Sequence, residues 1–228
     1  MTQNQKLQHV SPFWTEPDIV DTFANRDADK RLVELTRTYE KPEEIRVLDL
    51  GCAGGRNSVL LASGKFDFHA IDGSRPMISR TRERVAGIIG ATEAEQRVKL
   101  GSMDDLGSFS DGFFHLIVAL GIYHQSVSWD HWRKCISESA RVLEVGGLVL
   151  ISAFTPDSQP DGEPLKPVHE KQNMYEGFSS GPLCLLGQSD HDLAMASLGF
   201  GPFAPTETVR VETELGFRYT MNALYRKG

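Results

Sequence analysis

The sequence contains no hydrophobic run long enough to span a bilayer, and its polar first ten residues include no signal-peptide core. It also has no excess of positive charge: 24 Lys and Arg stand against 31 Asp and Glu, for a net charge of −7. A protein that binds duplex nucleic acid usually carries a basic surface. We therefore expect neither a membrane nor a nucleic acid as partner.

Cysteine is scarce. Cys52, Cys135 and Cys184 lie far apart without the spacing of a metal site, and the seven histidines form no zinc signature. This usage is typical of reduced cysteines in a cytoplasmic protein, with no metal centre. No internal repeat or low-complexity tract is present. At 228 residues, the chain can bury one sizeable α/β core.

The most informative stretch is residues 46–58, RVLDLGCAGGRNS. A short apolar run ends at Asp49-Leu50, three glycines and an alanine follow, and an apolar periodic run begins at Val59. This order predicts a buried strand, a tight glycine-rich turn and the start of a helix. Glycine allows positive φ and close approach of a ligand, and a helix N-terminus offers free N–H groups.

Two families use such a turn. The dinucleotide-binding fingerprint G-x-G-x-x-G fits poorly, because Arg56 takes the place of its last glycine and Asp49 would face a pyrophosphate. The stretch instead resembles motif I, (D/E)-x-G-x-G-x-G, of the class I S-adenosylmethionine-dependent methyltransferases, with Ala53 at the middle glycine. The resemblance implies that Asp49 acts at the methionine end of the donor, directly or through water. Gly51, Ala53 and Gly55 would admit its main chain.

A second strand is expected over residues 66–71, and it ends at Asp72, 21 residues after Gly51. That spacing suits a carboxylate that accepts hydrogen bonds from a ribose diol, whereas a solvated surface Asp would not predict it. Gly73 follows, and a helix is expected from Met77 to about residue 89. In the family, residues just after the acidic one flank the adenine, which makes Gly73, Ser74, Arg75 and Met77 candidate contacts.

Residues 96–101 are expected to form a third strand, and the Ser102-Met103-Asp104 loop after it resembles the family's G-D-x-x-x-L loop. Ser102 replaces the usual Asp. The resemblance implies adenine contacts from the Met103 N–H and from Asp104, while a solvated turn is the alternative.

Residues 113–120 form a near-continuous apolar run that suits a central parallel strand. Ligands of open α/β sheets bind at the carboxyl ends of such strands, so Leu120 is expected near the methyl group. Tyr123 and His124 come next as catalytic candidates, His124 as a general base for a hydroxyl acceptor. An ordinary polar turn is at least as good an interpretation of these two residues.

Further helices are expected over residues 129–143, with Ser128 as N-cap, and over residues 190–198. Strands are expected over residues 148–154, 207–217 and 218–226. Residues 1–44 should form a helical cap with two short helices, in which Trp14 and Phe23 either pack on the domain or cover the ligand site. The Pro-rich segment of about residues 155–188 is interpreted as a substrate lid, with His169, Glu170, Tyr175 and Phe178, or as a disordered loop.

This alternation predicts a three-layer, Rossmann-like, doubly wound α/β sheet of seven mostly parallel strands, the last antiparallel. The domain should span residues 45–228. The resemblance, close over residues 45–154, implies a methyltransferase that uses S-adenosylmethionine. A small-molecule acceptor with an O or N nucleophile is favoured. A tRNA or protein methyltransferase and a non-catalytic binding protein stay open, and a dinucleotide-dependent oxidoreductase is disfavoured.

Overall fold

The computed structural model describes residues 10–228, and within this range it divides into two compact units. The first comprises the described chain up to Met103 together with Phe113–Val118, and the second comprises Asp104–Gly112 and Ala119–Gly228. None of the helices in the described range is long and apolar enough to cross a membrane.

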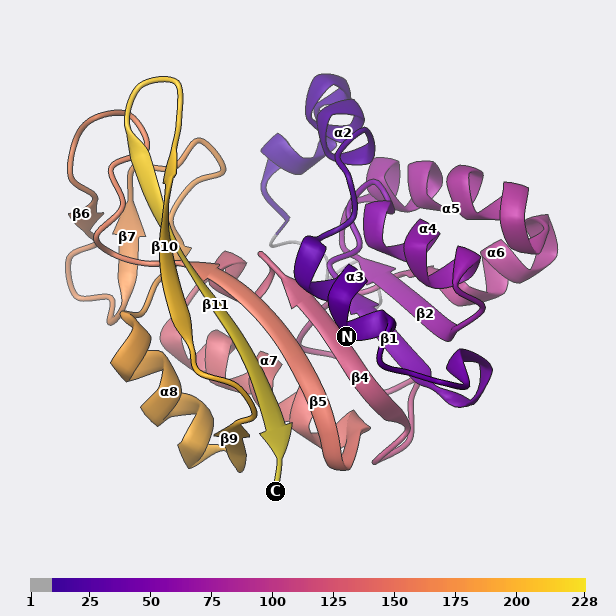
Figure 1. Cartoon of the computed structure of the whole chain (residues 1–228). Helices are drawn as coiled ribbons and strands as arrows, with labels where there is room; N and C mark the ends of the chain where they lie inside the picture. Colours follow the sequence, from indigo (N-terminus) through magenta and orange to yellow (C-terminus); the bar gives the residue numbers. More distant parts are fainter. Residues whose placement is uncertain (1–9) are drawn as a thin grey trace. The chain divides into compact units, whose positions relative to one another are not determined.

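The first unit begins with a helical segment and continues as an alternation of strands and helices (Figure 1). Its elements are, in chain order, η1 Pro12–Thr15, α2 Pro17–Ala24, α3 Lys30–Thr36, η2 Pro42–Glu44, β1 Arg46–Leu50, α4 Arg56–Ser63, β2 Asp67–Asp72, α5 Arg75–Ile89, α6 Ala91–Arg97, β3 Val98–Leu100 and most of β4 Phe114–Leu120. β1 pairs in parallel with β2 on one side and β4 on the other, and β2 pairs in parallel with β3.

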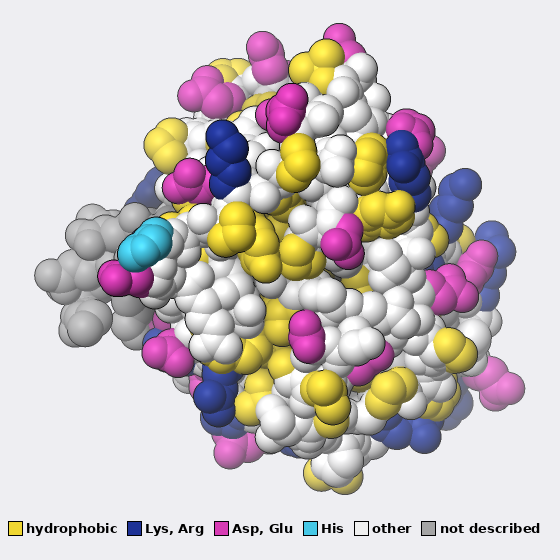
Figure 2. All heavy atoms as spheres, turned by 90° about the vertical axis from the view of Figure 1, so that its left-hand side faces the viewer, with side chains coloured by type: hydrophobic (Ala, Val, Ile, Leu, Met, Phe, Trp, Pro, Cys, Tyr) yellow, Lys and Arg dark blue, Asp and Glu magenta, His cyan; other side chains and the backbone are white. Residues whose placement is uncertain are grey.

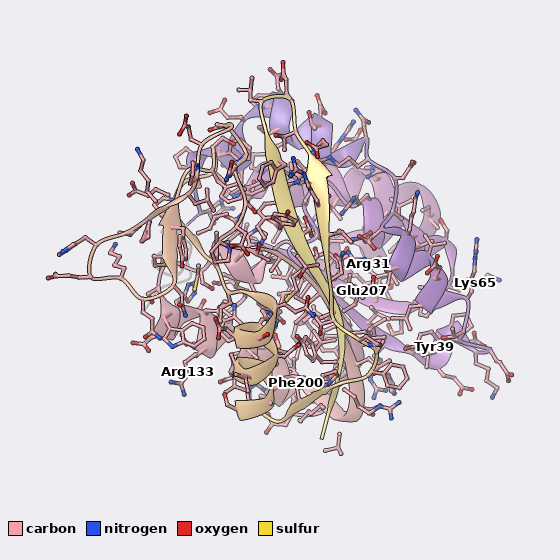
Figure 3. The ribbon with its side chains drawn as sticks, turned by 60° about the vertical axis from the view of Figure 1, so that its left-hand side comes forward. Arg31, Tyr39, Lys65, Arg133, Phe200 and Glu207 are labelled. Atoms are coloured by element: carbon pink, nitrogen blue, oxygen red, sulfur yellow. The ribbon has the colours of Figure 1, made fainter. Side chains whose placement is uncertain are left out.

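The second unit carries the remaining elements: η3 Tyr123–Gln125, α7 Trp129–Val142, β5 Leu143–Phe154, β6 Lys166–Pro167, β7 Met174–Glu176, β8 Leu183–Cys184, α8 Gln188–Ser197, β9 Phe200–Pro202, β10 Glu207–Glu212 and β11 Phe217–Lys227. β11 lies antiparallel between β5 and β10. β9 pairs with the carboxyl end of β11, where Phe200 lies opposite Lys227 (Figure 3).

The larger sheet has eight strands in the described range, in the order β10-β11-β5-β4-β1-β2-β3, with β9 attached to β11. Parallel strands with helical crossovers at one end and antiparallel strands at the other confirm the expected Rossmann-like fold. β9 was not expected, because three residues are too few to show the alternation of apolar and polar side chains that distinguishes a strand from a loop.

Local chemistry explains why the helices form where they do. The buried residues of α5 are Met77, Ile78, Thr81 and Val85, a stripe at helical spacing. α4 and α5 lie side by side in Figure 1, and both contact β2. The Ser128 side chain accepts a hydrogen bond from the His131 N–H, which confirms it as the N-cap of α7.

Two expected boundaries are wrong. Residues 96–97 belong to helix α6 and not to a strand, because Arg97 bonds Glu93 one turn back and also Asp67 of β2. The strand expected over residues 148–154 begins earlier, at Leu143, so Gly146 and Gly147 lie inside β5. Gly146 has a φ of 82°, so it bends the strand without ending a helix.

The Pro-rich segment forms a small sheet of its own in the order β6-β7-β8. Leu165, Leu183 and Leu185 form its buried cluster, against which Tyr175 and Phe178 pack. The disordered alternative is therefore wrong for this segment. His169 and Glu170 lie in its outer turn with side chains 92% and 85% exposed.

Candidate donor and acceptor sites

In the turn between β1 and α4, three of five consecutive residues have a left-handed backbone conformation. Gly51, Ala53 and Gly55 have φ values of 76°, 46° and 84°. The N–H groups of Gly51 and Cys52 both donate to the Ile71 carbonyl, at 2.8 and 3.1 Å. The turn is thus folded back onto the end of β2, as a glycine-rich ligand loop requires.

Asp72 ties that turn to the end of β2. Its Oδ2 accepts from the Ala53 N–H at 3.0 Å, and its Oδ1 accepts from the Ser74 N–H at 2.8 Å. Burial raises the pKa of Asp72, and the main-chain donors of Ser74, Ala53 and Gly73 oppose the shift. Each carboxylate oxygen has a second lone pair. Asp72 therefore keeps acceptor capacity for a diol while it holds the loop.

Asp49 lies deeper, with only 2% of its surface exposed. Its Oδ2 accepts from the Ser58 Oγ at 2.6 Å. Burial raises the pKa of Asp49 to about 6, and the charge of Asp72 adds to the shift while Ser58 and Arg56 oppose it. So deep a carboxylate fits the indirect form of the expected role, through water, better than a direct ion pair with an ammonium.

Helix α5 holds the turn from the other side, through two residues that the sequence reasoning missed. The Thr81 Oγ1 donates to the Ala53 carbonyl at 2.6 Å, and the Arg84 Nη1 donates to the Gly54 carbonyl at 2.8 Å. Thr81 is fully buried. The one feature of the sequence that could have indicated Thr81 is that it is a polar residue within the apolar stripe of α5.

The N-terminal segment also rests on the donor loops. The Ser74 Oγ donates to the Trp14 carbonyl at 2.7 Å, and the Trp14 and Phe23 rings meet edge to face at 5.2 Å. A side chain on Gly54 would come within 2.6 Å of Ala24, so the end of α2 packs on the loop main chain. Whether residues 1–44 cover a bound ligand stays a prediction.

The candidates for the adenine side are placed unevenly. Gly73 and Ser102 are half-buried, and Met103 is buried with 9% of its surface exposed. Met77 is 1% exposed, and its side chain packs in the core of the first unit. Asp104 belongs to the second unit, where its Oδ2 lies 2.7 Å from the Lys134 Nζ.

Leu120 is the last residue of β4, and Tyr123 follows three residues later. Leu120 is half-buried, and the next residue, Gly121, turns the chain with a φ of 84°. Tyr123 is fully buried, and its hydroxyl donates to the Ser139 Oγ at 2.7 Å. Burial also raises the pKa of Tyr123. Its placement supports a packing role against α7, because the hydroxyl is enclosed and already bonded.

His124 is 3% exposed, and its Nδ1 accepts from the Phe154 N–H at 3.2 Å. Burial lowers the pKa of His124 to about 3, with a further contribution from the charge of Arg218. The ring is therefore neutral near pH 7, with its proton on Nε2. In that tautomer the remaining ring nitrogen, Nε2, carries a proton, whereas a general base needs a free lone pair. The geometry therefore does not favour His124 as the expected general base.

Residues 47–147 match the family model described as methyltransferase domain. No curated protein matches the chain. Among solved structures, the chain is similar to the 1,6-didemethyltoxoflavin-N1-methyltransferase of Burkholderia thailandensis, solved with 1,6-didemethyltoxoflavin and S-adenosylhomocysteine. The identity is 16%, the match covers 100% of this chain and 91% of that one, and the TM-score is 0.68.

Two further structures have the same fold. The CcbJ methyltransferase of Streptomyces caelestis is 17% identical, with 96% of this chain and 98% of that one covered and a TM-score of 0.65. The PH0226 protein of Pyrococcus horikoshii is 20% identical, with 96% and 97% covered and a TM-score of 0.63. Residues 47–147 thus match a methyltransferase domain, and the chain shares its fold with these three solved structures.

Proposed function

We propose that the chain transfers the methyl group of S-adenosylmethionine to a small-molecule acceptor. The observation that carries this proposal is the segment after β5. It folds into the small sheet β6-β7-β8, whose buried cluster packs against Phe154, Tyr175 and Phe178. An insertion that has a leucine core and partly buried aromatic side chains around it suits a compact, largely apolar ligand. The net charge of −7 argues against a polyanionic RNA.

The residues of the first unit fit the donor. Asp72 offers lone pairs to a diol, and the loop from Gly51 to Gly55 presents main chain with little side-chain bulk. Asp49 supplies negative charge beneath the loop, and Thr81 fixes the Ala53 carbonyl. When bound, S-adenosylmethionine supplies a sulfonium methyl group, which passes in line to a nucleophile. The protein's part is to orient both reactants and exclude water.

The state of His124 bears on the kind of nucleophile. With its Nδ1 bonded to the Phe154 N–H and its pKa far below neutrality, His124 is not positioned to take a proton from a hydroxyl. An acceptor that arrives with a free lone pair, such as an amine or an already ionised oxygen, needs no such base. We therefore favour that kind of acceptor. The similar Burkholderia protein is named as the N1-methyltransferase of 1,6-didemethyltoxoflavin, which supports this choice.

The test follows label from methyl-tritiated S-adenosylmethionine. The enzyme is incubated with an extract of its own cells, which is then separated into small-molecule, RNA and protein fractions. We expect label among the small molecules, and less of it with Asp72→Asn. Label confined to RNA or protein would overturn the proposal. Binding of S-adenosylhomocysteine without label in any fraction would favour the non-catalytic alternative.

A further inference from the structure

Arg218, in β11, is a cation without an ion-pair partner among residues 10–228. Its Nε is buried and has no hydrogen-bond acceptor, and no carboxylate in the described chain forms an ion pair with it. Burial lowers the pKa of its guanidinium. A half-buried charge without a counterion costs free energy, so its presence calls for an explanation.

The two other arginines of the closing strands differ from Arg218. Arg210 is exposed, lies 3.7 Å from the centre of the Phe217 ring and bonds Glu212 at 2.7 Å. Arg226 is exposed beside Phe203. Both have water around them, and Arg210 has a counterion. Of the three arginines, Arg218 is the half-buried one, and it forms no ion pair with the described part of the chain.

An aromatic stack adjoins the guanidinium. The Arg218 Cζ lies 5.2 Å from the centre of the Phe154 ring. Thr220 lies opposite Phe154 in the β11–β5 register, so Arg218 and Phe154 emerge on the same face of the sheet. Phe154 stacks on His124 at 4.6 Å and on Phe178 at 4.9 Å, with interplanar angles of 17° and 7°.

The cluster of Arg218, His124, Phe154 and Phe178 presents hydrogen-bond donors and flat apolar surface, but no negatively charged acceptor. The guanidinium presents only donors, and neutral His124 presents its Nε2–H because Nδ1 is occupied. Phe178 is half-buried and comes from the segment that carries the small sheet. On the face of the molecule that carries β6, β7 and α8, hydrophobic side chains gather in the middle with a few acidic ones among them, and most other charged side chains lie nearer the edge (Figure 2).

We propose that Arg218, with the His124–Phe154–Phe178 stack, binds the methyl acceptor, and that this acceptor is a planar molecule that carries an anionic oxygen. The guanidinium pairs with that oxygen, and the aromatic rings hold the plane of the molecule. The inference rests on the proposed small-molecule function and narrows it to one substrate class. A guanidinium recognises a carboxylate or an ionised ring oxygen in the same way, through charge-assisted hydrogen bonds.

The test compares 2-naphthoate with its neutral amide, 2-naphthamide, on the full-length protein saturated with S-adenosylhomocysteine. The two probes share a shape and differ in charge. Titration calorimetry should show tighter binding of the acid by roughly ten- to a hundredfold, the usual contribution of a charge-assisted pair. In Arg218→Gln this preference should vanish. In Arg226→Gln, at the other end of the same strand, it should remain.

Two further variants separate binding from folding. Phe178→Ala should weaken the acid and the amide by the same factor, because stacking does not depend on charge. Arg218→Gln should keep or raise the melting temperature, since it removes a buried cation with no ion pair. A fall in melting temperature together with an unchanged preference for the acid would assign Arg218 a structural role.

The outcomes distinguish this inference from the proposed function. An equal preference for the acid in wild type and Arg218→Gln overturns the inference, and so does the absence of binding by 2-naphthoate. Neither result bears on whether small molecules are methylated. Failure of S-adenosylhomocysteine to bind, or label only in macromolecules, overturns the proposed function whatever Arg218 does.

Discussion

Asp49 and Asp72 stand at the ends of neighbouring strands, but their surroundings give them different properties. Asp72 accepts two main-chain N–H groups and keeps part of its surface exposed, so it is available to a ligand. Asp49 is enclosed and accepts one hydroxyl. The first carboxylate is suited to direct recognition, and the second to a charge that acts through the loop.

Asp72→Asn should weaken binding of S-adenosylhomocysteine by roughly ten- to a hundredfold, because the charge and one acceptor oxygen are lost. Titration calorimetry measures the effect. Asp157→Asn is the matched control, since Asp157 is exposed and lies outside the donor loops. An unchanged dissociation constant in Asp72→Asn would place this carboxylate away from the ribose.

Asp49 should make the protein less stable as pH rises from about 4 to 6. The pKa of Asp49 is about 6 in the folded state against 3.8 for an ordinary Asp, so in this range the folded state holds more protons than the unfolded state. Its stabilising contribution is complete below pH 3.8 and is lost by the time pH exceeds about 6. The change in free energy of unfolding is on the order of 3 kcal/mol.

The measurement is the difference between wild type and Asp49→Asn in urea unfolding, taken at several pH values. His124 and His191 have pKa values lowered to about 3 and 4, so they oppose Asp49 by destabilising the fold as pH falls. Both proteins contain these histidines, and the difference between the two proteins isolates Asp49. A difference that is constant from pH 4 to 6 would contradict the prediction.

Ala53 should prove to be strained. Its φ of 46° lies where a Cβ costs about 1–2 kcal/mol, whereas glycine pays no such cost. Ala53→Gly should leave the free energy of unfolding unchanged or raise it by up to about 1 kcal/mol, because the gain is partly cancelled in the unfolded chain. Ala53→Val should lower it by more than about 2 kcal/mol. Equal stabilities of the two variants would show that the turn relaxes.

At the scale of elements, the sequence predicted the order of strands and helices but not their points of contact. The turn at Gly51, the strand end at Asp72 and the N-cap at Ser128 follow from local chemistry and are where expected. The hydrogen bonds of Thr81 and Trp14 to the donor loops join residues that lie 28 and 60 positions apart. Local pattern carries no information about such pairs.

The same limit applies to His124. Its place after a central strand could be predicted, since parallel strands end at the ligand-binding edge. Its tautomer could not, because that depends on the Phe154 N–H, 30 positions away. The small sheet was missed because its strands have only two or three residues, too few for an alternating pattern to show.

The small sheet makes the expected behaviour of the lid more specific. Lys166 and Lys171 are the basic residues of segment 155–188, and the bond after Lys166 precedes a proline, which trypsin cleaves poorly. Limited trypsin treatment should therefore cut this segment after Lys171, in the exposed turn between β6 and β7. S-adenosylhomocysteine should slow the cut, and Lys171→Gln should abolish it. Equal rates with and without ligand would contradict a role as lid.

At the scale of the whole molecule, the division into two units separates the main functions. The glycine turn, Asp49 and Asp72 belong to the first unit, while Arg218 and the aromatic stack belong to the second. An affinity for the donor should therefore survive a substitution at Arg218. The Arg218→Gln variant should bind S-adenosylhomocysteine as the wild type does.

The ligand that stabilises the protein should be S-adenosylhomocysteine and not NAD. A ligand that binds only the folded state adds about 2.7 kcal/mol at a hundred times its dissociation constant, and each kcal/mol raises the melting temperature of a chain of this size by roughly 2–4 °C. Scanning calorimetry should thus show a rise of roughly 5–10 °C with S-adenosylhomocysteine.

NAD should cause no such rise in melting temperature. Its pyrophosphate would lie close to the charge of Asp49, and Arg56 occupies the position of the last glycine in the dinucleotide-binding fingerprint. Asp72→Asn should reduce the shift, and Asp157→Asn should not. A shift with NAD alone would mean that the glycine turn binds a dinucleotide.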